Sequence, residues 1–226
     1  MRKLIAITQL SLDGVMQAPG GPDEDRDSGF THGGWFMGFD DDAVPKAMDK
    51  LISGEFALLL GRRTYDIFAS YWPQHVDNPI GKAFGKAVKY VVTGKDKGLD
   101  WETSVRVGGK AAEGVRKLKA TKGPPLHVWG SSELLQALIA ADLVDEYQFW
   151  TAPVVLGYGK RLFEAGVPPQ KLQLVEGKIG SGGVLVTTYR PVGPLPQDSK
   201  AKGAPRKKPA AKNAKAGKKR KKKVGT

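Results

Sequence analysis

The stretch that decides the fold is Phe56-Ala57-Leu58-Leu59-Leu60-Gly61-Arg62-Arg63-Thr64-Tyr65-Asp66. Five apolar residues run without a break and end at Gly61, which is typical of a strand buried on both faces in a parallel sheet covered by helices. After Gly61 the pattern changes to a short amphipathic helix, with Tyr65 and Phe68 available for one face. The segment therefore predicts a strand-to-helix junction of an α/β protein.

Arg62 and Arg63 stand at the start of this helix, which is unfavourable for cations because a helix N-terminus is already partly positive. Two guanidinium groups, the Thr64 hydroxyl and the free backbone N–H groups of a helix start together favour a bound phosphate. The alternative is that both arginines simply point into water. On local chemistry we favour the anion site.

Charge divides the chain into two parts. The protein has 36 Lys and Arg against 23 Asp and Glu, a net charge of +13. Residues 200–226 hold 11 Lys, 2 Arg and no acid, so this segment carries the whole excess and residues 1–199 are neutral. A segment so basic and so poor in large apolar side chains is expected to be disordered. We expect a globular domain over 1–190, a Pro-rich linker over 191–199 and a basic tail over 200–226.

Several classes of protein and site are disfavoured by what the sequence lacks. No cysteine is present, so disulfides and thiolate chemistry are excluded. The three histidines have no partner at metal-ligand spacing, and we expect no metal site. Neither a G-x-S-x-G elbow, a P-loop nor a G-x-G-x-x-G after a strand occurs. No apolar run approaches the ~20 residues that span a bilayer, and the N-terminus lacks the pattern of a signal peptide. We expect a cytoplasmic protein without membrane contact.

Strands and helices alternate outward from the opening stretch, and two strands pair at the end of the chain. This order predicts an α/β fold with a mixed, mainly parallel sheet, helices on both faces and an antiparallel C-terminal hairpin. Residues 17–34, rich in Gly, Asp and Pro, form a loop long enough to act as a lid. We expect strands at 4–10, 56–60, 88–93, 104–107, 126–129, 146–155, 171–179 and 184–190. We expect helices at 43–53, 63–70, 109–120 and 131–140, and a short helix or a turn at 80–87.

Three strand ends carry Gly, Ser, Thr or Arg residues. They are Gly61 to Thr64, Thr93-Gly94-Lys95 and Gly130-Ser131-Ser132. Ligands of open α/β sheets bind at the carboxyl ends of the strands, where these junctions are expected to meet. Two phosphate-binding helix starts with an arginine pair suit a pyrophosphate and an additional 2′-phosphate, as in NADPH. The alternative is that glycines end strands in most folds.

Six landmarks, spread from Leu4 to Arg190, identify a resemblance. The landmarks are Ser11-Leu12-Asp13-Gly14, Gly61-Arg62-Arg63-Thr64-Tyr65, Lys89-Tyr90-Val91-Val92-Thr93, Val128-Trp129-Gly130-Ser131-Ser132, Leu143-Val144-Asp145-Glu146 and Pro153-Val154-Val155-Leu156-Gly157-Tyr158-Gly159. Through them the chain resembles the dihydrofolate reductase superfamily, and most closely the reductase (C-terminal) domain of the bifunctional riboflavin-biosynthesis deaminase-reductase and its stand-alone relatives.

The resemblance implies an oxidoreductase that transfers a hydride from NADPH. Dihydrofolate reductases have a Gly-Gly pair after the fifth strand, and here Trp129 replaces the first glycine. By position, the resemblance assigns the cofactor phosphates to Arg62, Arg63 and Thr64 after Gly61, the adenosine end to Thr93 and Gly94, the pyrophosphate to Gly130, Ser131 and Ser132, and the border of the nicotinamide to Ala6 and the Asp13-Gly14 turn.

The substrate implied by the resemblance is a ribosylaminopyrimidine, as for 5-amino-6-(5-phosphoribosylamino)uracil reductase, or a pterin. Asp13 is the candidate catalytic residue, with a turn role beside Gly14 as the alternative. Trp35 and Phe36 follow the lid and are candidates for stacking on a flat heterocycle; equally, they could anchor the lid in the core.

The basic tail leaves a second class of function open. Thirteen positive charges on a flexible segment should attract polyanions with a steep salt dependence and little sequence preference. The chain could therefore be a non-catalytic nucleotide- or nucleic-acid-binding protein, or the tail could have no partner. Because relatives are often dimers and the closing hairpin offers an edge, we also expect a homodimer.

Overall fold

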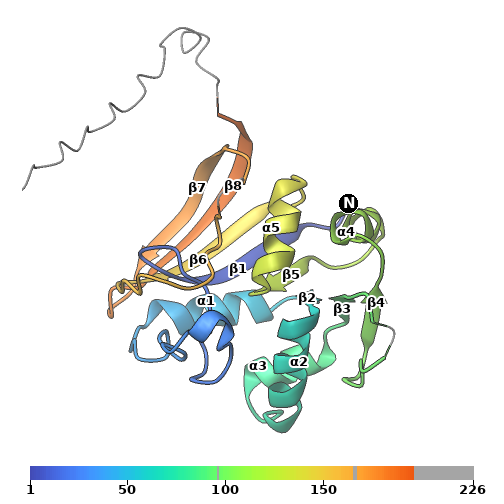
Figure 1. The fold of residues 1–226 in the computed structure, drawn as a ribbon, viewed down its shortest axis with the longest axis horizontal. Helices are drawn as coiled ribbons and strands as arrows, with labels where there is room; N and C mark the ends of the chain where they lie inside the picture. Colours follow the sequence, from blue (N-terminus) through green and yellow to red (C-terminus); the bar gives the residue numbers. More distant parts are fainter. Residues whose placement is uncertain (96, 165–166, 196–226) are drawn as a thin grey trace, which may run out of the picture. The chain divides into compact units, whose positions relative to one another are not determined.

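The computed structural model describes residues 1–95, 97–164 and 167–195, and the basic tail over 200–226 lies outside the described residues. Residues 1–195 form one compact unit around an eight-stranded sheet of order β4-β3-β2-β5-β1-β6-β8-β7 (Figure 1). The strands are β1 (Leu4–Ser11), β2 (Ala57–Gly61), β3 (Lys89–Val92), β4 (Ser104–Val107), β5 (Leu126–Trp129), β6 (Glu146–Ala152), β7 (Gln170–Ile179) and β8 (Leu185–Pro194).

The pairing confirms the predicted fold class. The first six strands pair in parallel wherever they are neighbours, and β8 pairs antiparallel with β6 and with β7. The helices are α1 (Ala43–Ile52), α2 (Arg62–Tyr71), α3 (Pro79–Lys86), α4 (Ala111–Ala120) and α5 (Ser132–Ala140), with short 3-10 turns η1 (Asp27–Gly29) and η2 (Trp72–Gln74).

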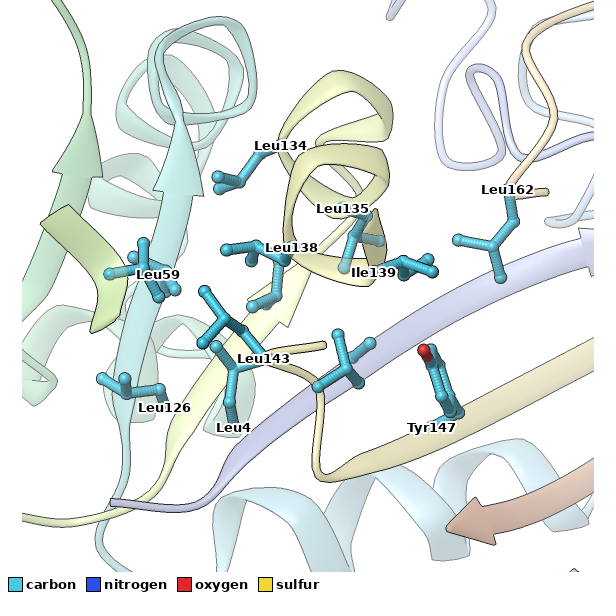
Figure 2. Packing of buried hydrophobic residues seen from close by; sticks show 14 of the residues in the cluster. Leu4, Leu59, Leu126, Leu134, Leu135, Leu138, Ile139, Leu143, Tyr147 and Leu162 are labelled. Atoms are coloured by element: carbon cyan, nitrogen blue, oxygen red, sulfur yellow. The ribbon is translucent and has the colours of Figure 1, made fainter. Parts of the chain in front are cut away.

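Helices cover both faces of the sheet because the central strands are apolar on both sides. In β2, Leu59 packs with α4 and α5, while Leu58 and Leu60 pack with α1, α2 and α3. Figure 2 shows the first of these layers, in which the leucines of α5 point toward β1, β2 and β6. Burial of alternate residues on opposite faces is what a parallel sheet between two helical layers requires.

Local sequence signals explain several element boundaries. Asn78 caps α3, since its side-chain oxygen accepts a hydrogen bond from the Ile80 N–H at 2.8 Å, and Pro79 occupies the first helical position. Strand β6 ends at Ala152, three residues before the expected Val155, because Pro153 follows and cannot donate a ladder hydrogen bond.

The C-terminal hairpin is longer than predicted. Strand β8 runs to Pro194, so residues 191–194 are strand in a segment expected to be linker. Strand β6 pairs with β8 only as far as Tyr189. Beyond that point one side of β8 has no neighbouring strand among the described residues, which is where a sheet tolerates prolines such as Pro191.

Asp41 and Asp42 attach the tip of this hairpin to the start of α1. The buried Asp41 carboxylate accepts hydrogen bonds from the backbone N–H groups of Gly182 and Val184, at 2.9 and 3.1 Å. The Asp42 carboxylate accepts one from the Ser181 N–H at 2.8 Å. These acids at the helix start are therefore used in packing the hairpin.

Candidate functional site

A cavity of about 820 Å³ lies at the carboxyl ends of the parallel strands. Its wall combines the ends of β1 and β5, the starts of α2 and α5, the loop after β3 and the loop over residues 17–34. The predicted cofactor residues that line it are Gly61, Arg62, Arg63, Thr64, Thr93, Gly94, Gly130, Ser131 and Ser132.

The two helix starts are held side by side by Ser131. Its hydroxyl donates a hydrogen bond to the Thr64 hydroxyl oxygen at 2.8 Å and accepts one from the Gly61 N–H at 3.0 Å. Ser131 has a left-handed backbone (φ 60°), as does Gly130 before it (φ 53°), and α5 therefore begins at Ser132. This sharp turn brings the β5–α5 junction against the β2–α2 junction.

Neither α2 nor α5 has a side-chain hydrogen bond at its N-cap. The first backbone N–H groups of a helix have no partner within the helix, and a bound anion is one of the groups that can satisfy them. Two such helix starts at one cavity give a place for a pyrophosphate. This is the observation of the structure that fits the implied dinucleotide.

The two arginines at the start of α2 diverge. Arg62 donates through Nε to both carboxylate oxygens of Asp66, at 2.8 and 3.0 Å, and through Nη1 to the Lys97 carbonyl at 2.9 Å. Arg63 turns the other way and forms ion pairs with Asp25 and Asp27 of the 17–34 loop. The nearby carboxylates offset the unfavourable field that a helix start imposes on a cation.

Lys160 completes this cluster of charges, which we call the lid cluster: Arg63, Lys160, Asp25 and Asp27. Lys160 Nζ lies 2.7 Å from a carboxylate oxygen of each aspartate. The hydrogen bonds from Arg63 and then from Lys160 lower the pKa of Asp27 from 3.8 to about 2. The lid cluster thus ties the 17–34 loop to the edge of the cavity.

Gln17, the first residue of the same loop, bonds to residues further along the loop and contacts Lys160. The buried side chain donates to the Asp25 and Asp27 carbonyls, at 3.2 and 3.1 Å, and accepts from the Lys160 N–H at 3.0 Å. Gln17 and Lys160 were not among the predicted site residues, and 133 to 135 residues separate Lys160 from the aspartates that it contacts. A contact between residues so far apart in the sequence leaves no local motif from which it could be predicted.

Trp35 and Phe36 are outside the cavity lining. Trp35 Nε1 donates to the Gln17 carbonyl at 2.8 Å, and Phe36 is buried beside Trp150 at a centroid distance of 6.5 Å. These contacts agree with the alternative in which Trp35 and Phe36 anchor the loop in the core. A substrate contact by either ring stays a prediction.

Asp13 also lies outside the lining, in a set of hydrogen bonds that joins two loops. Its carboxylate accepts from Ser11 Oγ at 2.7 Å, from the N–H groups of Leu156 and Gly157 at 3.1 and 2.9 Å, and from Arg161 at 3.0 Å. Burial alone would raise the pKa of Asp13, but the hydrogen bonds from Ser11, Leu156 and Gly157 hold it well below its ordinary range.

A carboxyl group with so low a pKa has no proton to give near neutral pH. The catalytic role of Asp13 stays a prediction, and the contacts describe a tie between the turn after β1 and the turn after β6. Gly14 has a left-handed backbone (φ 81°) in that first turn, and Ala6 is fully buried between β5 and β6. Both residues lie outside the cavity lining.

Thr93, Gly94 and Lys95 form the wall beside the sheet edge. The Thr93 hydroxyl accepts a hydrogen bond from the Lys95 N–H at 3.1 Å, which turns the chain after β3. Arg106 donates to the carbonyls of Thr93 and Gly94, at 3.3 and 3.4 Å. Lys95 is exposed and belongs to the cavity lining.

The sequence profile of the RibD C-terminal domain family matches residues 2–186. The chain belongs to the RibD C-terminal domain family. The uncharacterized protein YyaP of Bacillus subtilis (strain 168) is 28% identical over 196 residues, which cover 83% of this chain and 94% of YyaP. The family resemblance predicted from the sequence is thereby confirmed.

Two solved structures share the fold. A candidate riboflavin biosynthesis protein from Shewanella sp. PV-4 superposes with a TM-score of 0.62 at 20% identity, over 84% of this chain and 98% of that one. Enterococcus faecalis dihydrofolate reductase, complexed with NADP(H) and RAB-propyl, superposes with a TM-score of 0.51 at 14% identity, over 84% and 96%. The architecture is therefore dihydrofolate-reductase-like.

Within the described residues, no helix has both the length and the apolar character needed to cross a membrane. The same part of the chain contains no cluster of three or more His, Cys, Asp or Glu side chains that could hold a metal ion.

Proposed function

We propose that the protein is an NADPH-dependent reductase that transfers a hydride to a small heterocyclic substrate of the ribosylaminopyrimidine or pterin type. The observation that carries the proposal is the pair of helix starts joined by Ser131 at a cavity with two arginines in its wall. Membership of the RibD C-terminal domain family supports it.

Each part of the cavity has a separate task in this proposal. The backbone N–H groups at the starts of α2 and α5 bind the pyrophosphate, with the Thr64 and Ser132 hydroxyls beside it. Arg62 binds the 2′-phosphate, because its guanidinium group is already oriented by Asp66. Thr93 and Gly94 lie by the adenosine.

The cofactor, when bound, supplies the hydride, so the protein has to orient two rings and exclude water. The 17–34 loop is the element that closes over them, since Gln17, Ala18 and Pro19 belong to the cavity wall. Arg63 and Lys160 hold this loop through the lid cluster. Closure of such a loop is how reductive sites are commonly kept dry.

Titration of NADPH and NADH into the full-length protein tests the proposal. We expect micromolar binding of NADPH and weaker binding of NADH, since only NADPH carries the 2′-phosphate. Oxidation of NADPH, followed at 340 nm, is then measured with 5-amino-6-(5-phosphoribosylamino)uracil and with a dihydropterin. Absence of binding of either nucleotide would contradict the proposal.

A second candidate function rests on the charge of the tail. Residues 200–226 carry 13 cationic side chains and no acid. A non-catalytic protein whose main interaction is non-specific nucleic-acid binding would lose that interaction when the tail is removed, whereas a reductase would keep its NADPH affinity. DNA binding and NADPH binding are therefore measured for the full-length protein and for the protein without residues 200–226, each at two salt concentrations. Loss of DNA binding with unchanged NADPH affinity is expected of a reductase with an accessory tail.

We also propose a homodimer. Strand β7 lies at the edge of the sheet, and its Leu174, Val175 and Ile179 side chains are exposed. An edge strand with exposed apolar residues can pair with another copy of the chain. Size-exclusion chromatography with light scattering should give twice the mass of one chain, and the mass of a single chain would contradict this.

A further inference from the structure

Reduction of a C=N or C=O bond requires a proton as well as a hydride. The hydride adds to the carbon, the electron pair of the double bond passes to the nitrogen or oxygen, and that atom then takes up a proton. The described residues that line the cavity include no histidine or tyrosine. Since arginine does not release its proton, the groups of the lining that could supply one are carboxyl and ammonium groups.

The two ammonium groups of the lining have other surroundings. Lys160 is held between the carboxylates of Asp25 and Asp27 in the lid cluster. Lys95 is exposed and follows Thr93 and Gly94, beside which we place the adenosine and not the rings. Neither lysine is therefore suited to meet the bond that is reduced.

Four carboxyl groups of the described residues line the cavity: Glu24, Asp25, Asp66 and Glu133. Asp25 and Asp66 are in ion pairs with the two arginines of α2, and a carboxylate in such a pair carries no proton to give. Glu133 is exposed in the first turn of α5, where we place the pyrophosphate. Glu24, on the 17–34 loop, is the carboxyl group that remains.

The backbone orients the Glu24 carboxyl group. Its Oε2 accepts hydrogen bonds from the N–H groups of Gly20 and Gly21, at 2.7 and 3.2 Å. A protonated carboxyl group has one oxygen that only accepts and one that carries the O–H. Because two donors already face Oε2, the proton belongs on Oε1, for which the described residues provide no partner.

The surroundings of Glu24 favour its protonated form. The side chain is half-buried, and burial raises its pKa above the ordinary value of 4.5. The hydrogen bonds from Gly20 and Gly21 oppose this rise without cancelling it, and the neighbouring Asp25 carboxylate adds to it. No cation among the described residues forms an ion pair with Glu24, in contrast to Asp25.

We infer that Glu24 is the proton donor of the reductase, and that Oε1–H protonates the nitrogen or oxygen atom next to the carbon that receives the hydride. This inference rests on the proposed function and adds the catalytic acid. NADPH supplies the hydride and is oxidised to NADP+. The Glu24 carboxylate regains its proton from water, which reaches the half-buried side chain.

Glu24→Gln in the full-length protein tests this role, because the amide oxygen can still accept from Gly20 and Gly21 but the side chain has no acidic proton. Glu113→Gln, which changes an exposed acid of α4 outside the cavity lining, is the control. Oxidation of NADPH is followed between pH 5.5 and 8.5 with 5-amino-6-(5-phosphoribosylamino)uracil and with a dihydropterin.

Glu24→Gln should lower kcat by roughly 10²- to 10⁴-fold, the usual contribution of a general acid, with unchanged affinity for NADPH. The wild-type rate should fall as the pH rises, because Glu24 loses its proton, and the residual rate of Glu24→Gln should lack this fall. Glu113→Gln should behave as the wild type. A side chain that only supports the loop would not change the pH profile.

A second measurement does not depend on turnover. In full-length protein labelled with 13C at the glutamate carboxyl groups, the signal that Glu24→Gln removes belongs to Glu24. Its chemical shift is followed against pH, without nucleotide and with NADP+ bound. We expect Glu24 to titrate above its ordinary pKa of 4.5 in both states. Titration at or below 4.5 would overturn the inference.

The two proposals fail in different ways. If the wild type oxidises NADPH with either compound and Glu24→Gln does so at the same rate, the proton donor is another group and the reductase proposal stands. If the wild type binds neither NADPH nor NADH, the reductase proposal is overturned, and the role of Glu24 with it. If NADPH binds but neither compound is reduced, the carboxyl titration decides whether Glu24 is an acid of this kind.

Discussion

Ser131 and Thr64, which are 67 residues apart in the chain, are joined by a hydroxyl-to-hydroxyl hydrogen bond of 2.8 Å. The same Ser131 oxygen accepts from the Gly61 N–H. One side chain thus sets the relative position of the two helix starts to which we assign the pyrophosphate. The Ser131 side chain accepts no hydrogen bond from the first backbone N–H groups of α5, so these groups stay available to a ligand.

Ser131→Ala should separate these helix starts. The substitution removes the hydrogen bonds of the Ser131 hydroxyl with Thr64 and Gly61 and a long one to the Trp129 carbonyl, and we expect a loss of about 1–3 kcal/mol in the free energy of unfolding. NADPH affinity should fall several-fold, because the N–H groups of the two helices no longer converge. Denaturant unfolding and NADPH titration measure the two effects. Ser70→Ala, which removes one exposed hydrogen bond on α2, is the control. Unchanged NADPH affinity would show that the bridge does not position the site.

Asp25→Asn together with Asp27→Asn should release the 17–34 loop. The double substitution removes the carboxylates that hold Arg63 and Lys160 in the lid cluster. Backbone amides of the loop should then exchange with solvent faster, while those of β1 and β2 keep their protection. Hydrogen exchange measures both sets. Equal exchange of the loop in the variant and the wild type would contradict a role for the lid cluster.

The same loop should respond to acid. The pKa of Asp27 is lowered in the folded protein from 3.8 to about 2, so its ion pairs are complete above about pH 4 and are lost as the pH falls toward 2. The indole N–H signal of Trp35, which reports the bond to the Gln17 carbonyl, should shift in that window. A signal that is constant between pH 4 and 2 would contradict this coupling.

His127 should make the fold less stable in mild acid. The side chain is buried, stacks on Phe56 at 4.7 Å, and has no partner for Nδ1 among the described residues. Burial lowers its pKa from 6.5 to about 4. The unfolded chain therefore binds a proton between pH 6.5 and 4 that the folded protein does not, and stability falls by roughly 2–3 kcal/mol across this range.

Denaturant unfolding at pH 7, 5.5 and 4 measures this loss, and His127→Phe is the matched variant because it keeps the stacked ring. The slope of stability against pH between 6.5 and 4 should be smaller for His127→Phe than for the wild type. Identical slopes would show that other groups cause the acid sensitivity.

Asp13→Asn should weaken the fold rather than remove a proton donor. The change replaces one acceptor oxygen by an NH2 group that faces donors from Leu156, Gly157 or Arg161. We expect a loss of about 1–3 kcal/mol in the free energy of unfolding. If reductase activity disappears while the unfolding midpoint is unchanged, Asp13 acts in catalysis as the family position suggests.

The sequence was sufficient for those features that depend on local patterns. The unbroken apolar run before Gly61 predicts a doubly buried strand, and β2 is buried at Ala57 to Leu60. The order of the strands in the sheet is not local. Strand β2 lies beside β5, and only this neighbourhood places Ser131 against Thr64. The general rule that open α/β sheets bind ligands at the carboxyl ends of their strands indicated that these junctions would meet, but it did not give the strand order.

Long-range ion pairs and the ends of strands were harder to predict. Nothing in the neighbourhood of Lys160 in the sequence indicates its contacts with Asp25 and Asp27. The prolines after Arg190 favoured a linker, but an unpaired strand side accepts them, and β8 continues to Pro194. Trp35 could have stacked on a ligand or anchored a loop, and its hydrogen bond to Gln17 could be found only in three dimensions.

The most direct measurement is the affinity of the full-length protein for NADPH and NADH, in the wild type, Arg62→Ala and Arg63→Ala. Arg62 is assigned to the 2′-phosphate and Arg63 to the lid cluster. We therefore predict that Arg62→Ala loses most of the preference for NADPH over NADH, while Arg63→Ala keeps that preference. Equal affinity of the wild type for NADPH and NADH, or binding of neither, would contradict the proposed cofactor site.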